Sequence, residues 1–289
     1  MKIKAYAKIN LTLDIPKIRD DGYHELRSVF QTVSLYDELE INVSENSENE
    51  IILTCDTPNV PCDERNLCWK AATAILGKYQ IKGKKISIDL KKNIPSGAGL
   101  GGGSSDCAET LKALNKLLEI NAIDEELEEI GVKLGADVPF FIRGGTQLAE
   151  GIGEKLSELR LNFPEELYLV IIKPESELLS GNIYKIFDGL PKEKLPEAST
   201  EKFLSEISKG NTNAFNSITN MLEPAAKTLC PEIGDSEKLL IEMEAVTAMM
   251  TGSGSAVFGI FTNVNKAAEA LEAAKNKEKI IFGTMCRFK

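Results

Sequence analysis

Residues 94–105 read IPSGAGLGGGSS, and this stretch decides how the rest of the chain is interpreted. Ordering a glycine costs more backbone entropy than ordering any other residue, so a run this dense requires a reason. The alternation of Ile86, Ile88 and Leu90 predicts a strand before it. An apolar stripe at helical spacing between Cys107 and Leu118 predicts a helix after it. The stretch is therefore a loop between a strand and a helix.

Several kinds of loop share this composition. A dinucleotide-binding fingerprint fits Gly97, Gly99 and Gly102, but it needs a second strand ending in an acid about 20 residues later, where the pattern predicts helices. A Walker loop needs Lys followed by Ser or Thr, and Gly103-Ser104 stands there. Backbone N–H groups and the positive end of a helix can hold a phosphate without either template. A tight packing turn is the alternative, although one or two glycines would suffice for it. The run favours a phosphate-binding loop.

Composition restricts the class of protein. A length of 289 residues with 43% hydrophobic and 27% charged residues is typical of a soluble globular protein with one large or two small domains. The formal net charge of −10 disfavours binding to nucleic acid or to an anionic membrane surface. The sequence shows no signal peptide and no apolar run that could span a bilayer, which predicts a cytoplasmic protein. Six cysteines without a C-x-x-C pair indicate reduced thiols, not disulfides or a zinc site.

The remaining pattern predicts mixed helices and strands in two domains, residues 1–162 and 163–289, divided at a polar, Pro-containing stretch. Residues 1–15 alternate strictly and predict a half-buried strand whose polar face carries Lys8 and Asn10. Asn66 is expected to cap a helix, and Ser104, Ser105 and Asp106 are expected to cap the helix after the glycine loop. Further helices are expected at 124–134, 182–187, 201–208, 214–222 and 236–244, and strands at 29–43, 50–55, 168–172 and on both sides of residues 251–255.

The glycine loop resembles the ATP loop of the GHMP kinases, which include galactokinase, homoserine kinase, mevalonate kinase and phosphomevalonate kinase. The resemblance is carried by Pro95, Ser96, Gly97, Ala98, Gly99, Leu100, Gly101, Gly102, Gly103, Ser104 and Ser105. Four further stretches follow the family's order: AKINL at 7–11, GYHE at 22–25, GADVPFF at 135–141 and TGSGS at 251–255. Three positions depart from it, with Tyr6 in place of Pro, Cys107 in place of Ala and Ser180 in place of Thr. The four stretches are most similar to the branch that acts on a cytidine diphosphate derivative of methylerythritol in the non-mevalonate isoprenoid route.

The resemblance implies an α+β fold with an N-terminal ATP-loop domain and a C-terminal ferredoxin-like domain. It also implies ATP as phosphoryl donor and Mg²⁺ as its partner. Asp137 would accept the proton of the substrate hydroxyl, and Lys8 would keep that carboxylate ionised and offset charge on the transferred group. The pattern does not identify the metal ligands, although a hydroxyl from Ser104 or Ser105 is a candidate.

By the same resemblance, Asn66 lies on the adenine side of the site, and the substrate is bound by Asn10, Tyr23, His24, Ser180 and Tyr184. Each residue also has an ordinary explanation from its pattern alone: Lys8 as a solvated lysine, Asp137 as a turn or cap residue, His24 as a structural hydrogen bonder, Tyr184 as core, Asn66 as a helix cap and the 251–255 loop as a plain hairpin.

The functional alternatives are another GHMP kinase with a small alcohol substrate, a nucleotide-binding regulator without catalysis, and a nicotinamide oxidoreductase. The intact Lys8 and Asp137 argue against the regulator, and the absence of the acid that a dinucleotide fingerprint requires argues against the oxidoreductase. The sequence does not indicate whether the protein is a monomer or a homodimer.

Overall fold

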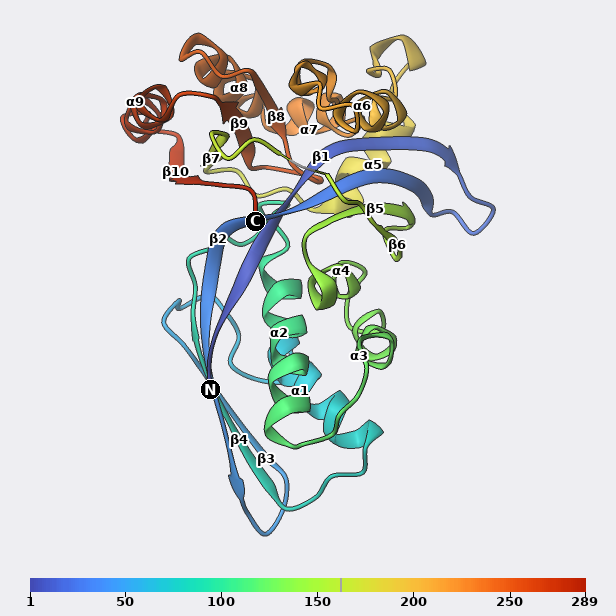
Figure 1. The fold of residues 1–289 in the computed structure, drawn as a ribbon, viewed down its shortest axis with the longest axis vertical. Helices are drawn as coiled ribbons and strands as arrows, with labels where there is room; N and C mark the ends of the chain where they lie inside the picture. The colour runs from blue at the N-terminus through green and yellow to red at the C-terminus, as the bar shows by residue number, and fades with distance from the viewer. Residues whose placement is uncertain (162) are drawn as a thin grey trace. The chain divides into compact units, whose positions relative to one another are not determined.

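The computed structural model describes residues 1–161 and 163–289 and divides into two compact units that alternate along the chain (Figure 1). Unit 1 contains residues 1–7, 35–96 and 101–144, and unit 2 contains residues 8–34, 97–100 and 145–289. Strands β1 (Lys2–Ile18) and β2 (His24–Glu45) contribute residues to both units. The predicted domain boundary falls at residue 162, which lies outside the described residues, so the division into 1–162 and 163–289 stays a prediction.

Unit 1 packs a small sheet against helices. The second half of β2 pairs antiparallel with β4 (Lys84–Lys91), and β4 pairs parallel with β3 (Glu50–Cys55). Helix α2 (Gly102–Leu117) packs against α1 (Leu67–Lys78) and α4 (Val138–Arg143), and α3 (Asp124–Gly131) packs against α4 (Figure 1). The alternating Ile86, Ile88 and Leu90 are all buried, as the sequence predicts. This packing fixes the strand and the helix on either side of the glycine loop.

The second half of the chain in unit 2 builds a four-stranded antiparallel sheet. Its strand order is β10 (Ile280–Cys286), β7 (Tyr168–Pro174), β9 (Val257–Phe261), β8 (Thr247–Met250). Helices α8 (Glu232–Glu242) and α9 (Val264–Lys275) pack on this sheet (Figure 1). In chain order the strands and helices form the β-α-β-β-α-β pattern of a ferredoxin-like domain, with additional helices after β7. The predicted C-terminal ferredoxin-like architecture is confirmed.

The connection from β7 to α8 differs from the predicted one. It contains α5 (Ser180–Asp188), the 3₁₀ turn η1 (Lys192–Lys194), α6 (Thr200–Ile207), the 3₁₀ turn η2 (Thr212–Ser217) and α7 (Glu223–Leu229). The helix predicted at 214–222 is wrong, because Leu13 of β1 donates to Thr219 O and accepts from Met221 N, which holds this segment extended. Helix α7 was not expected.

Two short strands in unit 2 were also not predicted. Strand β5 (Thr146–Gly151) pairs antiparallel with the first half of β2, and β6 (Lys155–Glu158) pairs with β5. The buried positions of β5 are Gln147, Ala149 and Gly151, which form no apolar alternation, so the sequence gives no period-two signal for this strand.

Strand β1 is buried on both of its faces between residues 7 and 14, so the predicted half-buried strand is wrong for this part. The polar face carries Lys8, Asn10, Thr12 and Asp14, and each of these side chains is at most 5% exposed. Burial of polar groups is tolerated when they are hydrogen-bonded. The Lys8 side chain donates to Asn10, and the side chains of Asn10, Thr12 and Asp14 are hydrogen-bonded to residues of unit 2 farther along the chain.

Two predictions from composition can be compared with the fold. All six cysteines are free thiols, as expected. Across residues 1–161 and 163–289, none of the helices combines the length and the apolar character needed to cross a membrane.

Candidate active site

Lys8 is buried in unit 2, with 4% of its surface exposed. Its Nζ donates a hydrogen bond of 2.7 Å to Asn10 Oδ1 and lies 4.6 Å from the centre of the Phe30 ring. Its backbone N–H donates to Leu100 O at 3.0 Å, which ties β1 to the glycine loop. A lysine held in this way is not a solvated surface residue, so that explanation is wrong.

Asn10 forms the centre of a buried polar cluster. Its Nδ2 donates to Ser28 Oγ at 2.9 Å, and its backbone N–H donates to Thr251 Oγ1 at 3.0 Å. The period of two on β1 brings Asn10 to the same face as Lys8, as predicted. Asn10 is 2% exposed, and its predicted contact with substrate stays a prediction.

The unit 2 part of the glycine loop, residues 97–100, lies against the loop of residues 251–255. A Cβ atom on Gly99 would stand 2.2 Å from Thr251 O, and Gly99 adopts a φ of +75°. Both features require glycine, because a side chain would collide with backbone and strain the left-handed conformation. Ala256 N–H also donates to Ala98 O at 3.2 Å. The 251–255 loop therefore connects β8 to β9 and also packs on the predicted ATP loop.

The unit 1 part of the glycine loop leads into α2, which begins at Gly102 with Gly101 as its N-cap in the left-handed region, φ 71°. No side chain caps this helix, so the predicted capping by Ser104, Ser105 and Asp106 is wrong. These residues lie within the first turns, where Ser105 Oγ donates to Tyr6 O at 2.7 Å. A helix end that side chains do not cap presents its N–H groups to an anion, as a phosphate-binding loop requires.

An ion cluster under the glycine loop was not predicted. Lys92 directly precedes the loop in the sequence. Its Nζ lies 2.6 Å from Asp106 Oδ2 of α2 and is also paired with Asp37 of β2. Asp37 Oδ1 accepts from the N–H groups of Asn93 and Ile94 at 2.5 and 2.8 Å. Burial raises the pKa of Asp106 to about 7, although Lys92 opposes the shift. The cluster joins the chain segment that enters the loop to the helix that leaves it.

Asp137 directly precedes α4 at its N-cap position, with φ −83° and ψ −11°, and its side chain makes no capping hydrogen bond. The segment before it passes close to α2, because a Cβ on Gly135 would stand 3.6 Å from Ser104 Oγ. The explanation of Asp137 as a side-chain cap is therefore wrong. Asp137 belongs to unit 1 and Lys8 to unit 2, so their predicted proximity stays a prediction.

Asn66 is the N-cap of α1, as expected from its position. Its Oδ1 accepts from Cys68 N at 2.8 Å, and its Nδ2 donates to Pro61 O at 2.8 Å. The predicted contact of Asn66 with adenine is not tested by these hydrogen bonds.

The predicted base-binding residues lie around α5. His24 Nε2 lies 2.6 Å from Asp188 Oδ1, and the rings of His24 and Tyr184 are in contact, with centres 4.6 Å apart. Two rings this close leave no room for a base between them, so a bound base would stack on another face of Tyr184. Tyr23 is 61% exposed. The structure thus brings His24 and Tyr184 together, and the binding of substrate by Tyr23, His24 and Tyr184 stays a prediction.

Ser180, at the start of α5, links this region to the 251–255 loop. Its Oγ lies 2.7 Å from Ser253 Oγ. The hydroxyl that the sequence assigns to substrate binding is therefore held beside the same loop that packs on Gly99.

The metal prediction can be tested against the available donors. Within the described residues, no three His, Cys, Asp or Glu side chains are arranged to hold a metal ion. Mg²⁺ with a nucleotide usually takes only one or two protein ligands and completes its shell with phosphates and water. Ser105 Oγ is bonded to Tyr6 O and Ser105 is 1% exposed, whereas Ser104 is half-buried. Ser104 fits such an ion better than Ser105.

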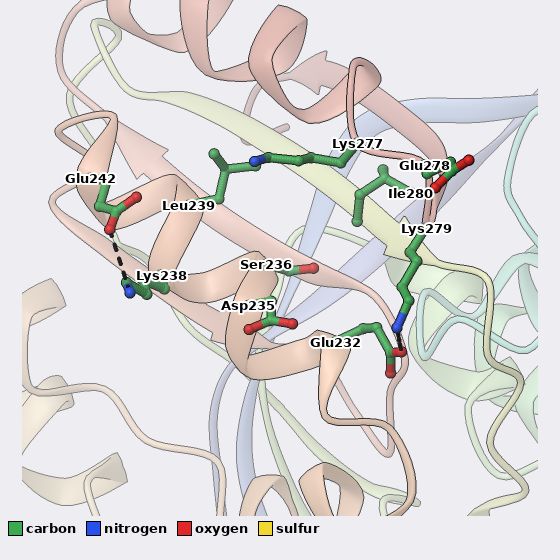
Figure 2. A pocket seen from close by; sticks show the side chains of 10 residues that line it. All are labelled: Glu232, Asp235, Ser236, Lys238, Leu239, Glu242, Lys277, Glu278, Lys279 and Ile280. Atoms are coloured by element: carbon green, nitrogen blue, oxygen red, sulfur yellow. Dashed lines mark hydrogen bonds and ion pairs between the residues drawn. The ribbon is translucent and has the colours of Figure 1, made fainter.

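A surface hollow lies away from these residues, between α8 and the segment 277–280 (Figure 2). Its charged side chains are largely paired, with Lys279 Nζ 2.6 Å from Glu232 Oε1 and Lys238 Nζ 3.8 Å from Glu242 Oε1. None of the predicted site residues lines it. The hollow is therefore not the candidate active site.

Two family models match the parts of the chain that contain these motifs. Residues 66–145 match the model of the GHMP kinases N terminal domain, and residues 197–280 match that of the GHMP kinases C terminal domain. The first match contains the glycine loop and Asp137, and the second contains the 251–255 loop.

The chain is also similar to named proteins over its whole length. A protein of Caldicellulosiruptor bescii named 4-diphosphocytidyl-2-C-methyl-D-erythritol kinase is 41% identical, covering 99% of this chain and 98% of its own. A protein of Clostridium beijerinckii with the same name is 42% identical, covering 98% and 99%. A crystal structure of 4-(cytidine 5'-diphospho)-2C-methyl-D-erythritol kinase matches with a TM-score of 0.82 and 32% identity over 99% of both chains. Homoserine kinase from Cytophaga hutchinsonii, at 22% identity and a TM-score of 0.73, shares the fold.

Proposed function

Because the chain belongs to the GHMP kinase family and is an ATP-dependent kinase, we propose that its acceptor is 4-diphosphocytidyl-2-C-methyl-D-erythritol. The reaction moves the γ-phosphoryl group of ATP to a hydroxyl of this compound. It is a step of the non-mevalonate route to isoprenoid precursors. The proposal is supported by relatives of that name at 41–42% identity over nearly the full length of the chain.

The observation that carries the site assignment is the contact between Gly99 and Thr251. It joins the predicted ATP loop to the 251–255 loop, and Thr251 in turn accepts from Asn10 N, two residues from Lys8. Phosphoryl transfer requires accurate positioning and charge neutralisation more than covalent participation of the protein. A glycine loop beside a buried lysine supplies both.

In the proposed mechanism, Asp137 accepts the proton of the substrate hydroxyl while the hydroxyl oxygen forms a bond to the γ-phosphorus of ATP. The bond from that phosphorus to the bridging oxygen breaks, and ADP leaves with the electron pair. Lys8 offsets negative charge on the transferred group, and the N–H groups at the start of α2 hold the phosphates. The carboxylate works as a general base only if it is ionised at the working pH.

Mg²⁺ would neutralise charge on the ATP phosphates and hold them in a fixed geometry. The Ser104 hydroxyl is the proposed protein ligand. Tyr23, His24 and Tyr184 are the proposed cytidine-binding residues, and Asn66 is proposed to lie on the adenine side.

ADP release should be measured with the cytidyl compound and, separately, with mevalonate, homoserine and galactose. We expect one ADP per phosphorylated cytidyl acceptor and little turnover with the others, with the product identified by ³¹P NMR. Efficient turnover of a different alcohol would assign another GHMP kinase activity. ATP binding without turnover of any alcohol would indicate a nucleotide-binding regulator.

A further inference from the structure

Asn220 is a buried residue that the sequence did not single out. It follows η2, precedes α7, and is 2% exposed. Its Nδ2 donates to Met250 O at 2.9 Å and to Gly252 O at 2.8 Å. Its Oδ1 accepts from Leu222 N at 3.0 Å. Both amide hydrogens and the amide oxygen are used, so only an amide side chain provides this set.

The two carbonyls that Asn220 binds lie on either side of Thr251. Asn220 thus fixes the backbone at the start of the 251–255 loop. Thr251 is the residue whose carbonyl approaches Gly99 and whose hydroxyl accepts from Asn10 N at 3.0 Å. A shift of this backbone would move both contacts together.

Asn220 is itself anchored to the strand that carries Lys8 and Asn10. It forms a parallel bridge with Leu13 of β1, whose N–H donates to Thr219 O at 2.9 Å and whose carbonyl accepts from Met221 N at 2.9 Å. The side chain therefore spans from β1 to the 251–255 loop, two parts of unit 2 that both contact residues 97–100.

We propose that Asn220 is a positioning residue for phosphoryl transfer, because it holds Thr251 against Gly99 and so sets the backbone that receives the ATP phosphates. The inference rests on the proposed function in assigning residues 97–100 to ATP. Asn220 touches no reacting atom in this role. A displacement of about 1 Å in a positioning element can lower a rate by about 100-fold, so the residue has a measurable effect without contacting substrate.

The decisive variant is Asn220→Asp. An ionised carboxylate would face the carbonyls of Met250 and Gly252 and repel both, whereas a protonated carboxyl can still donate to one of them. Burial would raise the pKa of such a group, and Glu223, whose Oε2 accepts from Met250 N, would add to the rise. The Leu222 N–H, which now donates to Asn220 Oδ1, and Lys227, which is paired with Glu223, would oppose it. Loop position in this variant should therefore depend on pH, which a packing defect would not do.

We expect the Kd of Asn220→Asp for Mg-ATP, measured by calorimetry, to be weakened about 10- to 100-fold at pH 8 and to recover toward wild type at pH 6. Asn263→Asp is the matched control, because Asn263 caps α9 through an acceptor oxygen that Asp retains. Ile233→Val controls for a loss of stability, because this buried residue of α8 belongs to the same apolar core as Leu222, near Asn220 in the chain. Neither control should change ATP affinity.

A loss of ATP affinity equal at both pH values, or no larger than in Ile233→Val, would overturn the proposal. If Asn220→Asp does not fold at pH 8, Asn220→Ala and Thr251→Val give an independent route, and the two single variants and the double variant are compared at pH 7. Losses that combine non-additively support a shared path through Thr251, and additive losses contradict it. ATP binding is measured here without any acceptor substrate. If the cytidyl compound did not react, the proposed acceptor would be refuted, but the result for Asn220 would still hold.

Discussion

Gly99→Ala should separate the two loops that meet in unit 2. The added Cβ would stand 2.2 Å from Thr251 O and 3.1 Å from Thr251 C, both backbone atoms that cannot rotate away. Ordinary contact begins near 3.4 Å, so the loops must move apart by about 1 Å. That movement weakens the hydrogen bond from Ala256 N to Ala98 O, which is 3.2 Å long.

The loss of folding free energy in Gly99→Ala can be estimated from the backbone strain and from the collision with Thr251. Placing a non-glycine residue at φ +75° costs about 1–2 kcal/mol, and overpacking adds about 1–3 kcal/mol. Gly210→Ala is a matched control, because Gly210 has φ +77° and a Cβ there meets nothing within 4 Å. The control carries the backbone strain without the collision.

Steady-state kinetics and thermal unfolding should be measured on both variants. We expect kcat/KM for ATP to fall about 100-fold in Gly99→Ala and to stay near wild type in Gly210→Ala, while both lose some thermal stability. Wild-type ATP kinetics in a folded Gly99→Ala protein would refute the contact between the loops and its role in phosphate binding.

Three further predictions concern single side chains. Asp137→Asn should lower kcat about 10²- to 10⁴-fold with ATP binding and melting temperature retained, and turnover within a few-fold of wild type would exclude Asp137 as the base. Tyr184→Ala should raise KM for the cytidyl acceptor about 10- to 100-fold while Tyr184→Phe stays mild, and a lowered melting temperature with unchanged KM would identify Tyr184 as core alone. Burial raises the pKa of Glu237 to about 8, with Glu223 adding to it, so the folded protein holds this proton more tightly than the unfolded chain. Stability should then fall as pH rises from about 5 to 8, and Glu237→Gln should melt above wild type at pH 8 with the difference shrinking toward pH 5; equal melting curves at both pH values would contradict this.

Local signals in the sequence predicted the parts of the fold whose causes are local. Asn66 caps α1 because its own side chain reaches the amide of Cys68 two residues on, and such a cap is visible in the sequence. The alternation of β4 is likewise set by a pattern within its own segment, whereas the ferredoxin-like C-terminal domain was implied by the family resemblance alone. The capping prediction for α2 was wrong because it relied on residue type, whereas Gly101 caps the helix through its left-handed backbone.

The site itself depends on contacts between distant segments, which a periodic pattern does not record. Lys92 and Asp106 flank the glycine loop, but Asp37, the other carboxylate that Lys92 binds, lies more than 50 residues before Lys92 in the chain. Asn220 was assigned to a helix, and its extended backbone follows from pairing with Leu13 of β1. In both cases the side chain gained its role from a partner that the neighbouring sequence does not contain.

Strand β1 shows why burial alone does not identify a functional residue. Its buried polar residues fall into two groups: one caps a helix, and the others contact the loops of the candidate site. Asp14 accepts from Ser199 N and Thr200 N, both at 2.9 Å, and so caps α6 from 185 residues away, where Ser199 supplies no side-chain cap of its own. That carboxylate is fully used by a helix end, which is a structural role. Lys8 and Asn10 lie on the same face, yet their contacts lead to Leu100 and Thr251, in the two loops that meet at Gly99. The alternation predicts that Lys8, Asn10 and Asp14 share one face of β1. It does not distinguish the capping residue Asp14 from the site residues Lys8 and Asn10, because that difference depends on which distant segments each side chain or backbone group contacts.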